Sequence, residues 1–342
     1  MSPKSFITLS ILTAIALFGA VVMVANDREL GPAAGAGDAA IEGLLKKAND
    51  VGAITIEHNA GTISLTSGDA GWAVKDRKGY AARTVNIKRT IFGLAQLTLS
   101  EPKTRLKQKF AKLELQDPDA PGARSKRIRL FDAAGKKIGD LIVGKRRPGL
   151  AGTTNGGMYV RKPGDTQTWL AAGDADLSVK NIDWLERKIV NIDAKRVKSI
   201  VLRHPGGEAV TITKATFEES LFALEGIPTG KKLISILDLT ATGKALSNLV
   251  LDDVTTVADA GAFDPAKTIT AEFTTFDGLV VRVRMVERKG TFWLTVEASG
   301  AHKGAATIAA RTKGWVYRIA DHTASTLTRR MQDLVEDAKP KT

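Results

Sequence analysis

Histidine and cysteine are the side chains most often used for metal binding and acid–base catalysis, and this chain of 342 residues has four histidines and no cysteine. His58 and His204 each stand just before a predicted turn, without a carboxylate or a second histidine at ligand spacing. His302 and His322 are isolated. A thiolate zinc site, a cysteine nucleophile and a disulfide framework are excluded because cysteine is absent. The sequence therefore predicts no metal site.

Nucleotide and hydrolase motifs are missing or incomplete. Residues 226–232, GIPTGKK, resemble a phosphate-binding loop, but the glycines are one residue too close and no Ser or Thr follows the lysine. No G-x-S-x-G elbow occurs, and no pair of carboxylates stands out for glycoside chemistry. We expect no catalytic residue and no cofactor, and an undetected hydrolase is the last of three functional hypotheses.

Positive charge is concentrated in one short stretch of the chain. The formal net charge is +13, and residues 101–150 contain fourteen basic and six acidic side chains. A concentrated positive field attracts phospholipid head groups and anionic glycans, whereas nucleic acid is not an expected partner. The alternative is a solvated basic face that keeps the protein soluble. The predicted binding surface consists of Lys103, Arg105, Lys107, Lys109, Lys112, Arg127, Arg129, Lys145, Arg146 and Arg147.

The N-terminus contains an uncharged apolar run over residues 6–25. About twenty helical residues span the hydrocarbon core of a bilayer, so this run predicts a single transmembrane helix. Lys4 and the amino terminus precede it, and Asp27, Arg28 and Glu29 follow it. The positive-inside rule then places residues 1–5 in the cytoplasm and the bulk of the chain in the periplasm, anchored in the inner membrane. A cleaved signal peptide is the competing interpretation. Residues 26–50 are expected to form a flexible tether and a short helix that buries Ile41, Leu44, Leu45 and Ala48.

The second half of the chain repeats the first at low identity. Five pairs of segments match in the same order at offsets of 145 to 150 residues: Ile54–Gly61 with Ile200–Gly207, Trp72 with Phe222, Phe131–Asp132 with Phe276–Asp277, Trp169 with Trp315, and Asp174 with Asp321. A shared order at near-constant spacing is the signature of an internal repeat. We expect two copies of one unit, over residues 51–197 and 198–338.

Each copy is expected to contain strands, then a helix, then more strands. Alternating apolar residues predict a hairpin over residues 54–65, a third strand at 72–74, and later strands at 127–130, 281–285 and 292–296, with turns at Gly135 and Gly278. The predicted helices bury Ile87, Ile91, Leu94 and Ala95 in the first copy and Leu233, Ile236, Leu237 and Ala241 in the second. Helix-like stretches at 179–189 and 325–336 close the copies. The order predicts an α+β fold: a tandem duplication of a unit with an antiparallel-rich sheet and covering helices, after one transmembrane helix.

The N-terminal anchor, the Trp72-Ala-Val opening, the helix that follows, Gly144, the Tyr159-Val160-Arg161 strand and the tandem copies together resemble the bacterial domain of unknown function 4340 family. The resemblance covers most of residues 50–338. The chain departs from the family pattern near residues 113–118, where a Tyr-Gly-Leu type sequence is typical. Such proteins are often encoded beside ABC-type permease components and a gliding-type auxiliary protein, which implies an accessory role.

Three hypotheses of function result. The first is a membrane-anchored extracytoplasmic accessory or interaction protein of an ABC-type envelope transport system, with no catalysis of its own and with the permease or the gliding-type auxiliary protein as partner. The second is a direct binder of anionic envelope lipid or glycan through residues 103–147. The third is the undetected hydrolase.

Overall fold

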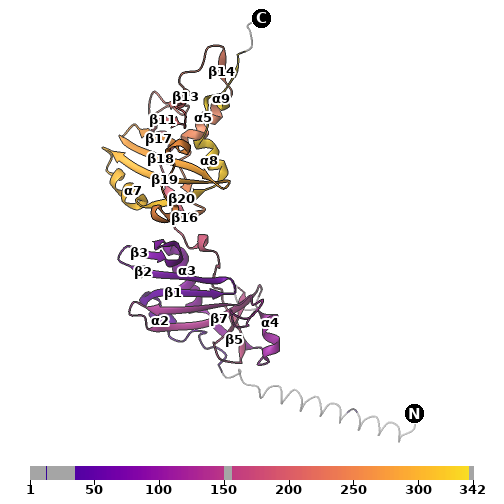
Figure 1. Ribbon diagram of the computed structural model, residues 1–342. Coiled ribbons are helices and arrows are strands. Elements are labelled where there is room, and N and C mark those ends of the chain that lie inside the picture. Colours follow the sequence, from indigo (N-terminus) through magenta and orange to yellow (C-terminus); the bar gives the residue numbers. More distant parts are fainter. Residues whose placement is uncertain (1–12, 14–34, 150–155, 339–342) are drawn as a thin grey trace, which may run out of the picture. The chain divides into compact units, whose positions relative to one another are not determined.

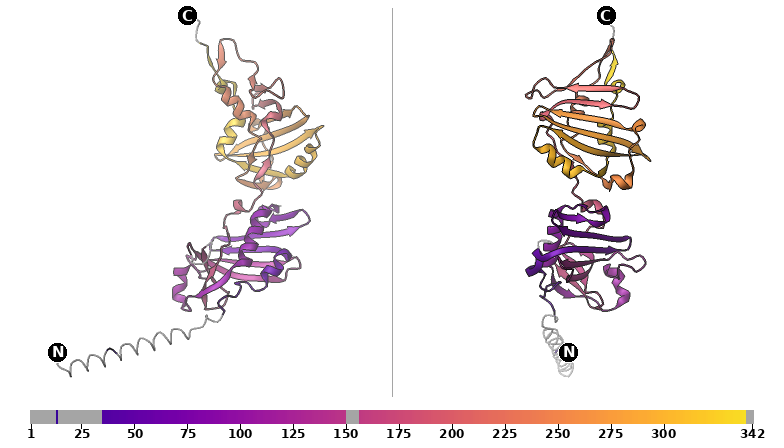
Figure 2. Two further views of the ribbon diagram at one scale, coloured as in Figure 1. Left: turned by 180° about the vertical axis from the view of Figure 1, so that it is seen from behind. Right: turned by 60° about the vertical axis from the view of Figure 1, so that its left-hand side comes forward.

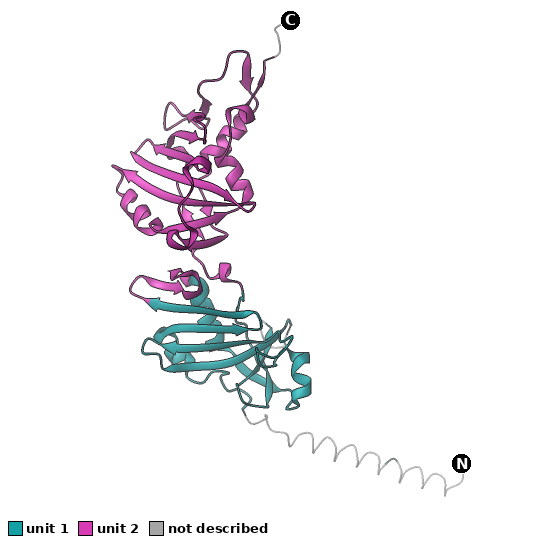
Figure 3. Ribbon diagram, in the orientation of Figure 1, with its two compact units in different colours: residues 1–67, 85–179 teal, residues 68–84, 180–342 magenta. Residues whose placement is uncertain are grey.

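The computed structural model describes residues 35–149 and 156–338, together with Thr13 (Figure 1). The described chain divides into two compact units (Figure 3). Unit 1 contains residues up to 67 and residues 85–179, and unit 2 contains residues 68–84 and the chain from residue 180 onward. Each unit is built around an antiparallel sheet, so the α+β class expected from the sequence is confirmed.

The sheet of unit 1 has the strand order β2-β1-β6-β7-β8-β9-β5, with every neighbouring pair antiparallel. Its strands are β1 (Val51–His58), β2 (Gly61–Gly68), β5 (Thr98–Pro102), β6 (Lys126–Asp132), β7 (Lys137–Arg147), β8 (Gly157–Arg161) and β9 (Thr168–Ala172). The helical segments are α2 (Leu44–Lys47), η1 (Ala48–Asp50), α3 (Thr84–Gln96), η3 (Lys107–Lys109) and α4 (Phe110–Leu113).

The core of unit 1 follows the alternation read from the sequence. Ile54 and Ile56 of β1 are buried on the same face as Ile128 and Leu130 of β6, because successive side chains of a strand point to opposite faces. Helix α3 lies across one face of the sheet (Figure 2). It buries Ile87, Ile91, Leu94 and Ala95, as predicted.

Unit 2 has a sheet with the order β13-β12-β11-β17-β18-β19-β20-β16, again antiparallel between neighbours. Its strands are β11 (Val197–Arg203), β12 (Ala209–Thr213), β13 (Ala223–Leu224), β16 (Asp253–Thr256), β17 (Ile269–Thr275), β18 (Leu279–Arg288), β19 (Thr291–Gly300) and β20 (Trp315–Ile319). β3 (Gly71–Val74) pairs with β4 (Tyr80–Ala81). Two smaller, two-stranded sheets join β10 (Lys188–Val190) to β15 (Leu249–Val250) and β14 (Lys231–Leu233) to β21 (Val335–Asp337). The remaining elements are η2 (Lys75–Arg77), η4 (Asn181–Asp183), η5 (Ala194–Arg196), η6 (Pro265–Lys267), α5 (Ile236–Gly243), α6 (Val257–Ala260), α7 (Gly304–Thr312), α8 (Asp321–Leu327) and α9 (Met331–Leu334).

The predicted strands and turns of unit 2 are confirmed. Val281, Val283 and Met285 of β18 are buried in alternation with exposed arginines. Gly278 forms the turn from β17 to β18 with a positive φ of 80°, and Gly135 does the same between β6 and β7 with a φ of 81°. Glycine adopts this left-handed backbone without the steric cost that a Cβ imposes.

The predicted face of the second helix is wrong. Leu233 lies in β14, and Ile236 and Leu237 are 39% and 74% exposed at the start of α5. The helix begins later than expected because residues 231–233 pair with β21 and the Ser235 side chain caps the first turn by accepting a hydrogen bond from the Leu237 amide. The buried face of α5 therefore carries Leu239.

Three further local predictions are corrected. Residues 179–189 form η4 and the start of β10 rather than a helix, and residues 325–336 contain parts of α8, α9 and β21. In the N-terminal segment, Ile41, Leu44 and Ala48 are buried as expected, but Leu45 is 62% exposed. Helix α2 has only four residues, so a single stripe of it faces the sheet.

The predicted cytoplasmic residues 1–5 and transmembrane helix 6–25 lie outside the described residues, apart from Thr13. Within the described part of the chain, we find no helix of the length and apolarity needed to cross a membrane. The predicted repeat boundary at residues 197 and 198 stays a prediction, because the division into units follows packing and not sequence repetition.

Candidate anion-binding surface and pocket

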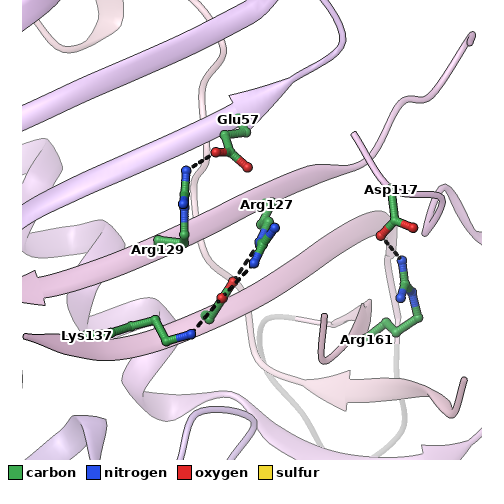
Figure 4. A network of polar contacts seen from close by, with 7 residues as sticks. Glu57, Asp117, Arg127, Arg129, Lys137 and Arg161 are labelled. Atoms are coloured by element: carbon green, nitrogen blue, oxygen red, sulfur yellow. Dashed lines mark hydrogen bonds and ion pairs between the residues drawn. The ribbon is translucent and has the colours of Figure 1, made fainter. Parts of the chain in front are cut away.

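Two of the predicted anion-binding arginines lie on the face of the unit 1 sheet, where carboxylates compensate them (Figure 4). Arg127 of β6 donates two hydrogen bonds of 2.9 Å to the two carboxylate oxygens of Asp140 on β7. Lys137 approaches the same carboxylate at 3.2 Å. Arg129 of β6 pairs with Glu57 of β1. Cross-strand ion pairs of this kind stabilise a sheet and leave little charge for a ligand.

The ionisation of this network follows from its geometry. Burial opposes ionisation of Asp140, but hydrogen bonds from Arg127 and Lys137 outweigh it and hold the pKa of the carboxyl below its ordinary value. The hydrogen bond to Asp140 also raises the pKa of Arg127. Asp140 is therefore ionised at neutral pH, and its charge compensates that of Arg127.

Three other predicted residues also have polar partners. Lys103 pairs with Glu101, whose pKa is lowered by the hydrogen bond and the charge of that lysine. Arg105 Nε donates to Gln167 Oε1 at 2.7 Å. Arg146 Nη2 lies 2.9 Å from Asp174 Oδ1 and donates to the Ala175 carbonyl at 3.1 Å.

The other five predicted residues, Lys107, Lys109, Lys112, Lys145 and Arg147, are exposed, and their side chains make no ion pair or hydrogen bond with any described residue. Three of them belong to one short segment, since Lys107 and Lys109 lie in η3 and Lys112 in α4. Leu106, immediately before η3, is 55% exposed. We call Leu106, Lys107, Lys109 and Lys112 the basic turn.

The start of the basic turn is held by Thr168, a fully buried residue of β9. The Thr168 hydroxyl accepts a hydrogen bond from the Thr104 amide at 3.0 Å and donates to the Thr104 carbonyl at 2.8 Å. The Lys103 amide donates to the Thr168 carbonyl at 2.8 Å. These bonds fix the point at which the chain leaves β5.

The end of the basic turn is held by Phe110, Leu115 and Arg161. Phe110 and Leu115 pack with Ile142 of β7 in one buried cluster. The Arg161 guanidinium, 3% exposed as a residue, lies 4.9 Å from the Phe110 ring centre and donates to the Leu115 carbonyl at 3.0 Å. Because Phe110 faces inward, Lys109 and Lys112 on either side of it face solvent.

The sequence predicts one surface of ten basic residues, whereas the structure gives five of their side chains polar partners within unit 1. Sequence reasoning missed the roles of Leu106, Thr168 and Arg161. Charge counting contains no signal for Thr168 or Arg161, because the residues that they connect to the basic turn, Thr104 and Leu115, lie more than forty positions away in the chain. The sequence does contain a signal for Leu106, because it is an apolar residue that stands between two basic residues and belongs to no periodic pattern.

Unit 2 contains a separate cavity of about 610 Å³ on its sheet. Thr270, Arg284 and Thr295 form its floor as directly opposed residues of β17, β18 and β19. Two aromatic residues, Phe263 and Trp315, belong to its walls. The other wall residues are Val257, Gly261, Ala262, Pro265, Thr268, Val296, Glu297, Thr312, Lys313, Gly314 and Val316. Arg284 is paired with Glu297 at 3.3 Å, so the floor is polar but charge-compensated.

The two matched histidines have local partners. His58 Nδ1 accepts a hydrogen bond from the Ala60 amide at 3.3 Å, in the turn between β1 and β2. His204 is 6% exposed, and its Nε2 donates to the Arg329 carbonyl at 3.0 Å. Both imidazoles therefore contribute hydrogen bonds to the backbone of their own units.

These sheets and surfaces define a two-unit antiparallel α+β protein. The model of a family described as Domain of unknown function (DUF4340) matches residues 72–268, which is more than half of the chain, and the chain belongs to this family. No curated protein and no solved structure matches the chain.

Proposed function

We propose that this chain is an interaction protein without catalysis of its own, anchored in the inner membrane and acting from the periplasm as an accessory subunit of an ABC-type envelope transport system. The family's frequent neighbourhood of permease and gliding-type auxiliary genes suggests the partner. The observation that carries the proposal is an exposed apolar group in unit 2. Ile234, Ile236 and Leu237 are 48%, 39% and 74% exposed within four consecutive residues.

This apolar group has the features of a protein-binding surface. Single exposed apolar residues are common, but adjacent large ones mark contacts with other proteins. Stable interfaces draw most of their energy from a few buried apolar or aromatic anchors. The group is held in place by the β14–β21 pairing and by the Ser235 cap, so it is presented on ordered backbone.

Co-purification from a detergent extract of native membranes tests the proposal. The full chain is compared with the double variant Ile236→Asp/Leu237→Asp, which keeps α5 because acidic residues are favourable in the first helical turn. We expect the wild type to retain permease subunits. The affinity of the double variant for them should fall at least about tenfold, which is a loss of about 1.4 kcal/mol of binding free energy. Leu45→Asp is the matched control, since Leu45 is also largely exposed.

Two results of this experiment contradict the proposal. Permease subunits absent from the wild-type sample would remove the transport role. Permease retained by the double variant would remove the apolar group from the interface.

We also propose that the two units arose by tandem duplication. In chain order, seven strands of each unit occupy the same positions in their sheets: β2-β1-β6-β7-β8-β9-β5 and β12-β11-β17-β18-β19-β20-β16. A register shift occurs between Val51 and Ala53 in β1 and between Val197 and Ser199 in β11, at the predicted offset of 146 residues. Bulges are retained as structural features within families, so this coincidence supports common descent.

One predicted match within the duplication is displaced. The register sets Asp132 opposite Val51 and Thr275 opposite Val197, so Asp132 corresponds to Thr275. The match of Phe131–Asp132 with Phe276–Asp277 is therefore wrong by two residues. The turns agree with this correction, because Gly135 and Gly278 each lie three residues after the corresponding position.

A second candidate function is direct binding of anionic envelope lipid or glycan. The free lysines of the basic turn favour it, because exposed cations without carboxylate partners remain available to an anion. The surface is smaller than the sequence predicts, since Arg127, Arg129 and Arg146 are compensated. Binding that is steeply weakened by salt is the expected sign of this function.

A further inference from the structure

We propose that the basic turn is the surface with which unit 1 rests on the anionic bilayer that holds its own N-terminal segment. This inference rests on the proposed function, because it requires residues 6–25 to be in the membrane. It names the partner as a phospholipid surface and the contact as three lysines around one inserted leucine. Three observations carry it: where the chain enters unit 1, how short the connection is, and what the turn exposes.

The first observation is the path of the chain into unit 1. The first described residues run antiparallel beside β5: the Gly37 amide donates to the Leu99 carbonyl and the Leu99 amide donates to the Asp38 carbonyl, both at 2.8 Å. Towards the N-terminus, this segment therefore runs towards the Pro102 end of β5. A Cβ at Gly35 would lie 3.4 Å from the ring of Trp169, which is paired with Pro102. The chain thus enters the unit beside the point from which the basic turn departs.

The second observation is length. Ten residue steps separate Ala25, the last residue of the apolar run, from Gly35. A fully extended chain covers at most about 3.3–3.6 Å per residue, so this connection spans no more than about 35 Å. Residues near the entry point are thereby kept close to the bilayer surface. The local concentration of lipid around the turn is high, and a weak contact is sufficient for docking.

The third observation is the composition of the turn. Lys107, Lys109 and Lys112 are exposed without partners among the described residues, and Leu106 beside them is 55% exposed. Each basic residue near an anionic membrane strengthens partitioning of a protein onto that membrane by about fivefold. An exposed leucine strengthens it further by inserting into the head-group region. Phe110 and Arg161 hold the turn from inside, so these side chains are presented together.

Carboxylates near the basic turn would compete with phospholipid for its lysines. The carboxylates on the face of the unit 1 sheet already have cationic partners. Arg127 and Arg129 are already matched by Asp140 and Glu57 on the sheet. Glu101, before the turn, is matched by Lys103, and Glu114, two residues after Lys112, lies 3.6 Å from Arg124. The basic turn is therefore left with uncompensated charge.

Site-specific fluorescence on the full chain tests the proposal, and the absence of native cysteine makes single-site labelling direct. Leu106→Cys carries an environment-sensitive dye, and the protein is reconstituted in vesicles of phosphatidylcholine with or without phosphatidylglycerol. We expect a blue shift only in the anionic vesicles, reversed by high salt. Ala60→Cys is the control, because the exposed turn between β1 and β2 is separated from β5 by four strands of the sheet.

Charge variants separate electrostatics from damage to the fold. In the triple variant Lys107→Glu/Lys109→Glu/Lys112→Glu, we expect docking to weaken by more than about a hundredfold, the product of three fivefold effects. Lys46→Glu/Lys47→Glu/Lys136→Glu makes the same change in net charge at exposed lysines of unit 1 and should keep the blue shift. Equal thermal unfolding of both variants confirms that they are folded.

The outcomes distinguish the docking contact from the anchor. Flotation of the chain with neutral vesicles tests the anchor alone, and failure to float would overturn the proposed anchoring. Flotation without a dye response to phosphatidylglycerol would overturn the docking surface and leave the anchor intact. A dye response to a soluble anionic glycan but not to anionic vesicles would also overturn it, in favour of a glycan ligand.

Discussion

Arg161 Nη2 donates a hydrogen bond of 2.7 Å to Asp117 Oδ1, and the same guanidinium donates to the Leu115 carbonyl at 3.0 Å and the Asp165 carbonyl at 3.1 Å. One nearly buried side chain of β8 therefore joins three parts of unit 1 and holds the end of the basic turn. Arginine suits this position because its planar fork serves several acceptors at once.

Arg161→Lys is expected to destabilise unit 1 by about 2–3 kcal/mol, because an ammonium group cannot serve the three acceptors and leaves the buried Leu115 carbonyl unpaired. Urea unfolding measures the loss. Arg127→Lys is the comparison, since its partly exposed pair with Asp140 should cost less than about 1 kcal/mol. An equal cost for both variants would contradict the role of Arg161.

Gly144→Ala is expected to destabilise the protein by about 1–3 kcal/mol. A Cβ at this position of β7 would lie 2.6 Å from the Glu114 carbonyl oxygen and would also collide with the Leu113 carbonyl. Gly68→Ala, in β2, is the control because nothing lies within 4 Å of its added Cβ. Gly144→Ala should unfold at a clearly lower temperature than Gly68→Ala. Equal unfolding temperatures would contradict the prediction and show that α4 can move away from the added Cβ at no cost.

Glu114→Gly is expected to leave stability unchanged or raise it by about 1 kcal/mol. Glu114 follows α4 with a φ of 56°, in the left-handed region that favours glycine. Its contact with Arg124 is 3.6 Å long and exposed, so little is lost with the carboxylate. Lys112→Gly, inside α4, should instead cost about 1 kcal/mol. We expect the denaturant midpoint of Glu114→Gly to be equal to or higher than that of the wild type, and the midpoint of Lys112→Gly to be lower.

Acidification should weaken unit 2 through Asp277. A hydrogen bond from Arg196 at 2.7 Å is the main cause that lowers the pKa of Asp277 to about 2. Because this folded-state pKa lies below the ordinary value near 3.8, the stabilisation is complete above about pH 4 and is lost as the pH falls towards 2. Asp277→Asn should flatten that part of the stability profile, measured by unfolding at several pH values. An unchanged slope would exclude Asp277 as its source.

The proposed N-terminal anchor leads to a prediction of membrane topology. The mature chain should retain residues 1–25 and expose Thr342 outside the cytoplasm, because Lys4 and the amino terminus precede the apolar run while Arg28 after it is flanked by two acids. A reporter that matures only in the cytoplasm should give no signal when fused after Thr342. A mature N-terminus near Asn26 or Gly37 would contradict the prediction.

The sequence by itself determined the local elements. The alternation through Ile54, Ile56, Ile63 and Leu65 specifies a hairpin, since a strand buries every second residue on one face. The 3.6-residue spacing of the apolar positions in α3 specifies its buried side for the same kind of reason. The family resemblance was also readable, because its markers are local patterns.

Only the tertiary structure decided which local patterns are used. The apolar spacing at residues 233–241 suits a longer helix, but pairing of residues 231–233 with β21 removes the first part of it. The same holds for charged residues. Arg127 and Lys112 are both basic residues of the same positively charged stretch, yet Arg127 pairs with Asp140 on the neighbouring strand and Lys112 is exposed to solvent. Compensation of a charge depends on groups distant in the chain and within a few ångströms in space, so the surface available to an anion is a property of the fold.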